Sequence, residues 1–433
     1  MESLFSSRRP SRISRAFSPR VELLENRLNL AGAITAVLTG STLTITGDEL
    51  ANEVRIVGNG SGNLSVSGVN GTLINDLTEA VDFTAVANLV INLGDDSDIA
   101  TLVAADLAGF LFVSGGNGDD QLQFGELAGE NQSFGNIVAR MGEGNDAIRI
   151  DGNNFTVDQS FTALLGNGNN TTDLDPANLD VGILTVVNGN GTDTTEIGAG
   201  TTTTGLLTVF GGAGDNTTLL SGSLTVAGAL TVAGRDGIDA VTAAGTSLDV
   251  SGIATLFLGG GNNTVALNHT STTVDTALAI VTLGGDDQIG FGGATVELGN
   301  VGVATGLGND QVNLIATATM NVQGLAGVAL GMGNDTLNIE NAHFQGITTL
   351  LTGAGTDTVN IETASNNGAG TSFAAFTAIE LGLGDDTLNV GLDANDFAAF
   401  AAATIISGGL GGDVFNDSGF NTFAIQPVLV SIT

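Results

Sequence analysis

The stretch GMGNDTLNI, residues 331–339, places two glycines, an Asn and an Asp directly before an alternation of polar and apolar residues. The same order returns in GLGNDQVNL, residues 306–314, and in GLGDDTLNV, residues 382–390. Strict alternation is typical of a half-buried β-strand, and glycine adopts positive φ angles without steric cost. The pattern therefore predicts a sharp turn followed by a strand, made repeatedly along one chain.

These turns recur with a nearly constant period. Aligning the last acidic or amide residue of each turn gives one series: Asp98, Asp120, Asp146, Asn170, Asp193, Asn216, Asp239, Asn263, Asp287, Asp310, Asp335, Asp357, Asp386 and Asp413. Its ends lie 315 residues apart over 13 steps, so the period is about 24 residues. GDELANEVRI, around Asn52, looks like an earlier, degenerate copy. Residues 40–420 are thus almost entirely one array, which predicts a single repeat domain over residues 31–433.

The segments between the turns are rich in Gly, Thr, Asn and Ser and carry no helical periodicity. Parallel strands that are not joined by crossover helices are typical of a solenoid. We therefore predict an all-β fold, a parallel β-solenoid of the β-helix or β-roll kind, with about 24 residues per coil. Roughly fifteen coils stacked at about 4.8 Å would form a rod on the order of 70 Å long.

Charge is distributed unevenly along the chain. Six of the ten Arg lie in residues 1–30, whereas the remainder holds four Arg against 43 acidic residues, the total of 46 less Glu2, Glu22 and Glu25. Such a body repels nucleic acid and anionic membranes, and no apolar stretch is long enough for a transmembrane helix. Stacked carboxylates about 4.8 Å apart would repel by about 1 kcal/mol or more per pair. Ca²⁺ between successive turns would reverse that sign.

A family resemblance points to the same ion. GGNGDDQLQF, residues 115–124, contains the pattern GGxGxDxUx, in which U is a large apolar residue, and GEGNDAIRI and the stretches quoted above are similar to it. The pattern resembles the haemolysin-type (RTX) calcium-binding repeat, which implies turns that bind Ca²⁺ in a parallel β-roll. This chain has one turn per coil of about 24 residues instead of nonapeptides back to back. We therefore expect a wider helix with calcium along a single edge.

The resemblance assigns the metal role to the acidic members of the series. They form an uninterrupted C-terminal run and a shorter N-terminal run, with two Asp between them that alternate with Asn. The candidate calcium ligands are Asp98, Asp120, Asp146, Asp193, Asp239, Asp287, Asp310, Asp335, Asp357, Asp386 and Asp413. Asn170, Asn216 and Asn263 lack the carboxylate, and we expect no ion at those turns. The alternative is a ladder of Asx turns without metal.

Residues 1–30 form a different, basic segment. They lack the continuous apolar stretch of a secretory signal, although AGA at residues 31–33 would suit a cleavage site. LLENRLNLA, residues 23–31, resembles the LEPR-XLL segment that precedes repeat regions in large bacterial surface and secreted proteins, with Asn26 where that motif has Pro. We predict a targeting or leader segment, disordered or removed, and an extracellular or cell-surface location. A disordered basic arm is the alternative.

The favoured function is a secreted or surface-exposed calcium-binding repeat protein with a structural or adhesive role. Besides calcium ions, an adhesin's partner would be a polysaccharide or protein of the cell surface or matrix, without nucleic acid and without membrane insertion. Thr336 and Asn338, with their equivalents in other coils, are predicted to face outward and to form side-chain ladders between coils. Ice binding by such a face is a less favoured alternative.

The alternative from another class is a carbohydrate-active β-helix, a polysaccharide lyase or hydrolase. Such enzymes need positioned acid–base groups and aromatic platforms for sugar rings, and the chain has no Lys, Tyr or Trp. Arg140 and Arg149 flank one turn, and we expect salt links to Glu143 or to the acidic edge. His269 and His343 share no motif and are expected at the surface or in satisfied turns. We therefore expect no enzyme activity.

Overall fold

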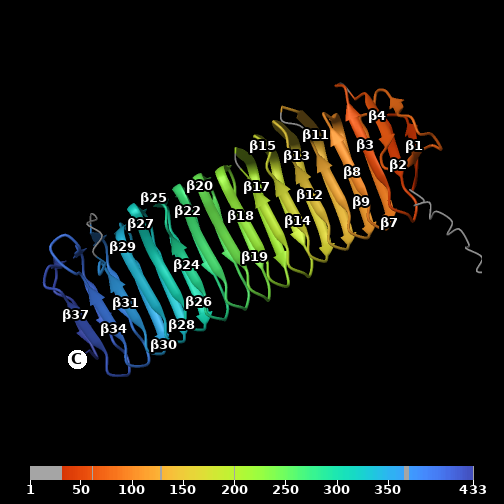
Figure 1. The fold of residues 1–433 in the computed structure, drawn as a ribbon. Coiled ribbons are helices and arrows are strands. Elements are labelled where there is room, and N and C mark those ends of the chain that lie inside the picture. The colour runs from red at the N-terminus through yellow and green to blue at the C-terminus, as the bar shows by residue number, and fades with distance from the viewer. Residues whose placement is uncertain (1–31, 61, 127–128, 199, 365–369, 433) are drawn as a thin grey trace, which may run out of the picture. The chain divides into compact units, whose positions relative to one another are not determined.

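The computed structural model describes residues 32–432, apart from residues 61, 127–128, 199 and 365–369. Within these residues the chain forms strands and no helix. The strands wind into a parallel β-solenoid with about 24 residues per turn (Figure 1), which confirms the predicted fold class. Ala31–Thr433 form one compact unit. The predicted leader segment, residues 1–30, lies outside the described residues.

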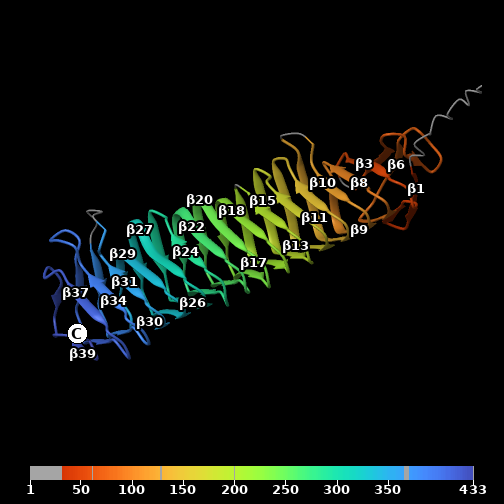
Figure 2. The same ribbon diagram turned by 60° about the horizontal axis from the view of Figure 1, so that its bottom comes forward.

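Each coil carries three strand segments, so the solenoid has three faces (Figure 2). We call them the pre-turn face, which leads into the glycine turn, the post-turn face, which follows it, and the third face, which completes the coil. Several long strands bend from one face to the next. In β11 (Asn131–Glu143), for example, the parallel register shifts between Phe134 and Ile137.

The strands divide among the faces as follows. The pre-turn face contains β2 (Thr42–Thr46), β7 (Asn88–Asp95), the C-terminal halves of β9 (Asp106–Asn117), β11, β13 (Asn154–Asn167), β15 (Asn178–Asn188) and β17 (Thr201–Gly212), then β19 (Leu230–Gly234), β21 (Ile253–Phe257), β23 (Ala277–Val281), β26 (Val301–Leu307), β28 (Ala326–Met332), β30 (Thr348–Ala354), β33 (Thr377–Glu380), β36 (Thr404–Ser407) and β39 (Val428–Val430). The post-turn face contains β3 (Glu53–Gly58), β8 (Ile99–Val103), β10 (Gln121–Phe124), β12 (Ala147–Ile150), β14 (Thr171–Leu174), β16 (Thr194–Ile197), the N-terminal halves of β18 (Thr217–Val226), β20 (Ala240–Val250), β22 (Thr264–Val274), β27 (Gln311–Val322) and β29 (Thr336–Phe344), and β24 (Gln288–Phe291), β31 (Thr358–Ile361), β34 (Thr387–Val390) and β37 (Val414–Asp417). The third face contains the N-terminal halves of β9, β11, β13, β15 and β17 and the C-terminal halves of β18, β20, β22, β27 and β29. It also contains β25 (Thr295–Leu298), β32 (Thr371–Phe373), β35 (Ala398–Phe400) and β38 (Thr422–Phe423).

Neighbouring coils pair in parallel and in register, so like residues stack on like. Thr336 lies beside Thr358, and Leu337 lies beside Val359. Leu337 and Val359 point inward and are fully buried, and such side chains form one continuous core along the solenoid. Burial of each large aliphatic side chain contributes about 1.5–3 kcal/mol. The outward Asn residues form the expected ladder, since Asn360 Nδ2 donates to Asn338 Oδ1 at 2.9 Å.

The N-terminal end of the solenoid differs from the rest. There β1 (Ala33–Thr39) pairs with β2, and β4 (Leu64–Gly68) pairs with β3 and β6 (Val81–Phe83), all antiparallel, while β5 (Leu73–Ile74) pairs with β1 in parallel. Parallel coils begin where β2 pairs with β7 and β3 pairs with β8. An open sheet edge invites pairing with other chains, and these hairpins cover it. The uniform parallel array that the sequence predicts from residue 31 is wrong for this first part.

Stacked aromatic rings fill the core of the last coils. Phe373 is 1% exposed, and its ring stacks on Phe344 at 5.1 Å and on Phe400 at 4.7 Å between ring centroids. These separations match the spacing of neighbouring strands, about 4.8 Å. In-register pairing therefore places each ring on the next.

We expect Phe373→Ala to lower the free energy of unfolding by about 3–5 kcal/mol, because it leaves a cavity between two fixed rings. Phe420→Ala is the control, since that side chain is 51% exposed. Chemical denaturation followed by circular dichroism measures both variants. Equal losses for the two would contradict the packing described here.

Candidate metal site at the buried Asp ladder

The glycine turns have the backbone that the sequence predicts. In the turn of residues 331–336, Gly331 and Gly333 have φ angles of 106° and 142°. The Gly333 N–H donates to the carbonyl of Ala354 in the next coil at 2.8 Å. A side chain at Gly333 would place its Cβ 1.6 Å from the carbonyl oxygen of Gly308. Both the dihedral angle and the stacking of coils therefore require glycine.

All eleven candidate Asp residues point inward below these turns and are at most 3% exposed. One carboxylate oxygen of each accepts a backbone N–H from the equivalent residue one coil earlier. Asp310 donates in this way to Asp335 Oδ1 at 2.7 Å, and Asp335 donates to Asp357 Oδ1 at 2.8 Å. The chain of bonds, which we call the Asx ladder, runs unbroken from Asn52 to Asp413. Asn52, at the degenerate copy, is its first member.

The second carboxylate oxygen is the chemically unusual part of the site. In ten of the ladder residues Oδ2 is buried and has no hydrogen-bond partner among the described residues: Asp98, Asp120, Asp146, Asp193, Asp239, Asp287, Asp310, Asp335, Asp357 and Asp386. A buried acceptor without a donor costs about 1–3 kcal/mol, and more when it is charged. Thr282, Thr305 and Thr352 lie near enough to Asp287, Asp310 and Asp357 to lower the pKa of these three carboxyls against the effect of burial. None of the described residues forms an ion pair with any of the ten carboxylates.

The Asn members of the ladder reveal what surrounds that position. Asn263 Nδ2 donates to the carbonyls of Gly259 and Gly261 at 3.2 and 2.9 Å. Asn170 Nδ2 likewise donates to the carbonyls four and two residues before it, both at 3.1 Å. Since the coils stack in register, an Asp in the same place directs Oδ2 at carbonyl oxygens. That arrangement is stable only with a proton or a cation between the oxygens.

Burial raises the pKa of ten ladder carboxyls, because the ionised form loses its hydration. The pKa is raised to about 7 for Asp120 and Asp335, and neighbouring ladder carboxylates add to the effect. It is raised to about 6 for Asp98, Asp146, Asp287 and Asp386. Burial also raises the pKa of Asp193, Asp239, Asp310 and Asp357. These groups therefore gain and lose protons nearer to neutral pH than ordinary Asp carboxyls do.

A second ladder runs along the outside of the same turns, and the sequence analysis missed it. In many coils the side-chain oxygen of the residue before the ladder residue accepts a backbone N–H from the coil that follows: Asn309 N–H donates to Asp286 Oδ1 at 2.7 Å, and Asn334 N–H donates to Asn309 Oδ1 at 2.9 Å. Its donors point in the opposite direction to those of the Asx ladder. The signal was the Asn or Asp that precedes the ladder residue in GND and GDD.

The other charged candidates do not assemble with the ladder. Arg149 pairs with Asp151 at 2.7 Å and with Asp173 at 3.8 Å, not with Glu143, and the Arg140 guanidinium lies 5.8 Å from the centre of the Phe112 ring. The expected surface location of both histidines is wrong for one of them. His269 is fully buried in β22, where burial lowers its pKa; His343 Nδ1 lies 2.9 Å from the Ser372 hydroxyl.

Metal binding at these turns would depend on backbone oxygens. Among the described residues, no three His, Cys, Asp or Glu side chains come together as a metal site. The part of the chain that the structure describes also has no helix long and apolar enough to cross a membrane. Comparison with known protein families, curated proteins and solved structures finds no match to this chain.

Proposed function

We propose that the protein is an extracellular or cell-surface solenoid with a structural or adhesive role, stabilised by Ca²⁺ at its glycine turns. The observation that carries the proposal is the buried Oδ2 atom that lacks a donor in ten ladder residues. Each Asn of the series in β13–β22 places an amide nitrogen in the corresponding position. A cation satisfies the carboxylate and the carbonyls together, as the amide does in those coils.

The oxygen donors at the turn suit Ca²⁺. At Asp335 they would be its Oδ2 and the carbonyl oxygens of Gly331 and Gly333, with equivalent atoms in other coils. Carboxylate and carbonyl oxygens in an adaptable arrangement are the usual ligands of Ca²⁺. When bound, the ion supplies the positive charge that the ladder lacks. Affinities of about 10⁻⁴ to 10⁻³ M are expected, as in extracellular modules.

The location and role follow from charge and sequence context. Weak sites fill only where Ca²⁺ is millimolar, which favours the outside of the cell. The LEPR-XLL-like stretch near the N-terminus supports export. The proposal includes no catalysis, since Arg149 is held in ion pairs and Arg140 lies over an aromatic ring. Adhesion would use the long outer faces of the rod, toward a polysaccharide or protein of the surface or matrix.

Exchange of Asp and Asn within the ladder tests where calcium binds. Asp335→Asn should keep the fold and lose calcium, because the amide can donate to the carbonyls of Gly331 and Gly333. Asn263→Asp should gain calcium, because it restores a carboxylate between Asp239 and Asp287. Isothermal titration calorimetry at millimolar Ca²⁺, with equilibrium dialysis, measures the number of bound ions.

Two alanine variants serve as controls for that experiment. Asp335→Ala removes the carboxylate and the ladder hydrogen bond, so it should weaken binding at both neighbouring turns. Asn263→Ala should leave the number of bound calcium ions unchanged. Wild-type protein that binds no calcium at pH 8, or stoichiometries that ignore the Asp and Asn exchanges, would reject the calcium proposal.

A further inference from the structure

The outer side of the pre-turn face is unusual for a chain with a net charge of −36. The last outward residue before each turn forms one column across eleven strands, from β11 to β33. Coil by coil this column reads R-L-V-F-A-F-V-A-A-L-E, from Arg140 to Glu380. The column beside it reads V-T-T-T-T-T-A-G-G-T-A, from Val138 to Ala378. Within these two columns only the terminal Arg140 and Glu380 are charged.

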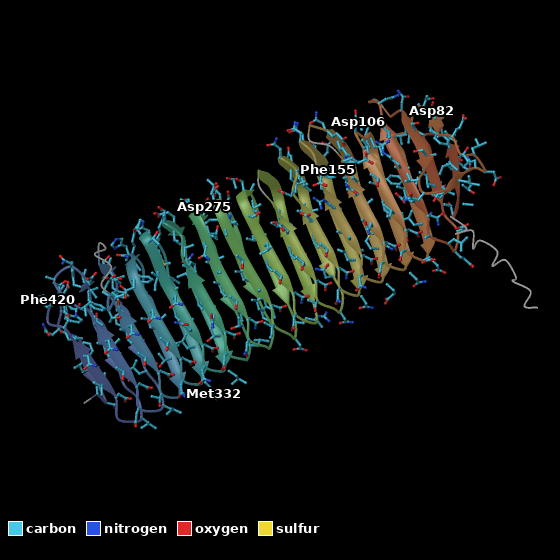
Figure 3. All side chains as sticks on the ribbon, viewed as in Figure 1. Asp82, Asp106, Phe155, Asp275, Met332 and Phe420 are labelled. Atoms are coloured by element: carbon cyan, nitrogen blue, oxygen red, sulfur yellow. The ribbon has the colours of Figure 1, made fainter. Side chains whose placement is uncertain are left out.

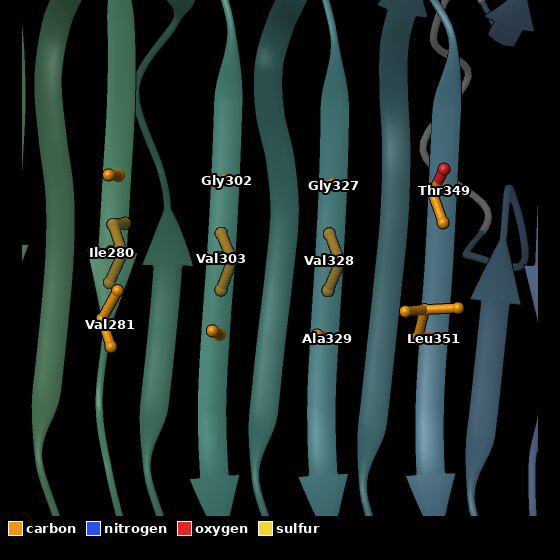
Figure 4. Close-up of a pocket in the computed structure, with 11 residues that line it drawn as sticks. Ile280, Val281, Gly302, Val303, Gly327, Val328, Ala329, Thr349 and Leu351 are labelled. Carbon is orange, nitrogen blue, oxygen red and sulfur yellow. The ribbon is translucent and has the colours of Figure 1, made fainter.

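This face has projections in one half and a hollow in the other. Phe210 and Phe257 are 42% and 39% exposed. Farther along, β23, β26, β28 and β30 border a hollow of about 280 Å³, where Gly302 and Gly327 lie among aliphatic side chains such as Leu351 (Figure 4). A Cβ at Gly302 or Gly327 would have no other atom within 4 Å. The surface is therefore apolar, with projecting rings in one half and a hollow in the other.

The residues on either side of β21 are arranged so that two copies could pair about a two-fold axis at that strand. Rotation by 180° about an axis parallel to β21 places each strand opposite the strand that lies equally many coils away on the other side. Phe210 then faces Ala304, and Val187 faces Ala329, so large side chains meet small ones at these four positions of the column. On the axis Phe257 meets its own copy, and nearer the ends Leu164 meets Leu351. In the adjacent column Thr208 faces Gly302 and Thr185 faces Gly327. A surface that complements itself about a two-fold axis is the requirement for a symmetric dimer.

The two charged residues of the column obey the same symmetry. Arg140 lies five coils before Phe257, and Glu380 lies five coils after it. The rotation therefore places Arg140 of each copy opposite Glu380 of the other. Among the described residues neither side chain has an ion pair of its own. Oppositely charged pairs at the rim of an interface fix the register of the partners.

We propose that two copies of this chain pair through their pre-turn faces about a two-fold axis at β21. Eleven strands at about 4.8 Å give a length of about 50 Å, and a width of about 17 Å gives roughly 850 Å² per copy, the size of a standard stable interface. The acidic side chains elsewhere on the rod oppose self-association. Asp106 and Asp275, for example, lie along the corner of the rod away from the turn residue Met332 (Figure 3). The pre-turn face joins an uncharged stretch to exposed aromatic side chains, so like copies can meet there.

Sedimentation velocity of the full chain in millimolar Ca²⁺ tests the proposal over nanomolar to tens of micromolar protein. We expect a monomer–dimer equilibrium. Phe257→Asp should shift it to monomer, because the rotation brings the two new carboxylates together. Circular dichroism should be unchanged, since Phe257 faces outward. A monomer at all concentrations, larger aggregates, or a dimer that survives Phe257→Asp would overturn the proposal.

Charge reversal tests the register of the two copies. Arg140→Glu and Glu380→Arg should each raise the dimer dissociation constant, on the order of tenfold, and the double variant should restore it. Arg149→Glu, on the post-turn face, is the matched control and should leave the constant unchanged. Failure of the double variant to restore the dimer would overturn the two-fold register. Because calcium is present throughout, these results are independent of the ladder variants that test calcium binding.

Discussion

With chelator present, raising the pH from about 5 to about 8 should unfold much of the solenoid, and millimolar Ca²⁺ should refold it at pH 8. Six ladder carboxyls, those of Asp98, Asp120, Asp146, Asp287, Asp335 and Asp386, have pKa values raised to about 6 or 7 by burial, against an ordinary value of 3.8. A raised pKa means that the folded chain holds these protons more tightly than the unfolded chain does. Their contribution is therefore complete below pH 4 and is lost as the pH rises through 6 and 7.

The expected effect is comparable to the whole stability of a domain. One pKa unit corresponds to about 1.4 kcal/mol, and water that reaches the turns screens part of the cost. We take about 1 kcal/mol for each of the six carboxyls whose pKa rises most. The free energy of unfolding then falls by about 6 kcal/mol, against a typical stability of 5–15 kcal/mol. Calcium binds the ionised carboxylate and so removes this loss, and its apparent affinity should fall as the pH falls.

Urea denaturation followed by circular dichroism at several pH values, with chelator and with Ca²⁺ at equal ionic strength, measures the effect. The double variant Asp120→Asn, Asp335→Asn should show a weaker pH dependence, since two of these carboxyls are replaced by neutral amides. Asp249→Asn removes an exposed charge outside the ladder and serves as the control. Stability that rises with pH in chelator, or that is unaffected by Ca²⁺ at pH 8, would contradict the interpretation of the ladder.

Gly333→Val should disrupt its coil even when calcium is saturating. The variant places a β-branched residue at a φ of 142°, with its Cβ 1.6 Å from the Gly308 carbonyl oxygen. Neither conflict can be relieved by a rotamer change, because the backbone of two stacked coils causes both. We expect a loss of more than about 4 kcal/mol, in the range of severely destabilising substitutions.

Gly290→Val provides a matched control for the glycine argument. Gly290 lies in β24 on the post-turn face, has no positive φ, and would bring its Cβ near one other atom only, the Val265 carbonyl oxygen at 4.0 Å. Valine favours strands, so the control should keep the stability of the wild type. Limited proteolysis locates the damage, and we expect new cleavage near residues 308–355 only in Gly333→Val. Comparable stability of the two variants would refute the steric argument.

Much of the fold could be read from local sequence. The alternation in stretches such as TLNI and the glycines of the turns both act within a few bonds of backbone, and they return with a period of about 24 residues. They determine strand, turn and strand in every coil, and stacking in register follows because each coil repeats the last. The same signals miss part of residues 33–83, where β1 and β4 cover the open end of the solenoid through antiparallel pairs with β2, β3 and β6 that no repeat encodes.

The site was predictable in its residues but not in its chemistry. The series from Asp98 to Asp413 was visible from spacing alone, and its glycines marked the turns. Spacing does not say which way a side chain points at a corner, so the burial of the carboxylates was not predicted. The structure buries them, bonds one oxygen of each to the preceding coil, and leaves the other without a donor in ten of them.

The sequence by itself therefore determined the class of fold, the coil length, and the residues at each turn, because those depend on short-range steric preference and on periodic burial. Only the tertiary structure decided the burial of the ladder carboxyls and the shape of the pre-turn face. Both depend on atoms about 24 residues or more apart in the chain. Asp335 Oδ1 accepts its hydrogen bond from the Asp310 N–H, and Phe210 and Phe257 lie on either side of the small side chain of Ala233. Contacts of that kind exist only after the coils have stacked.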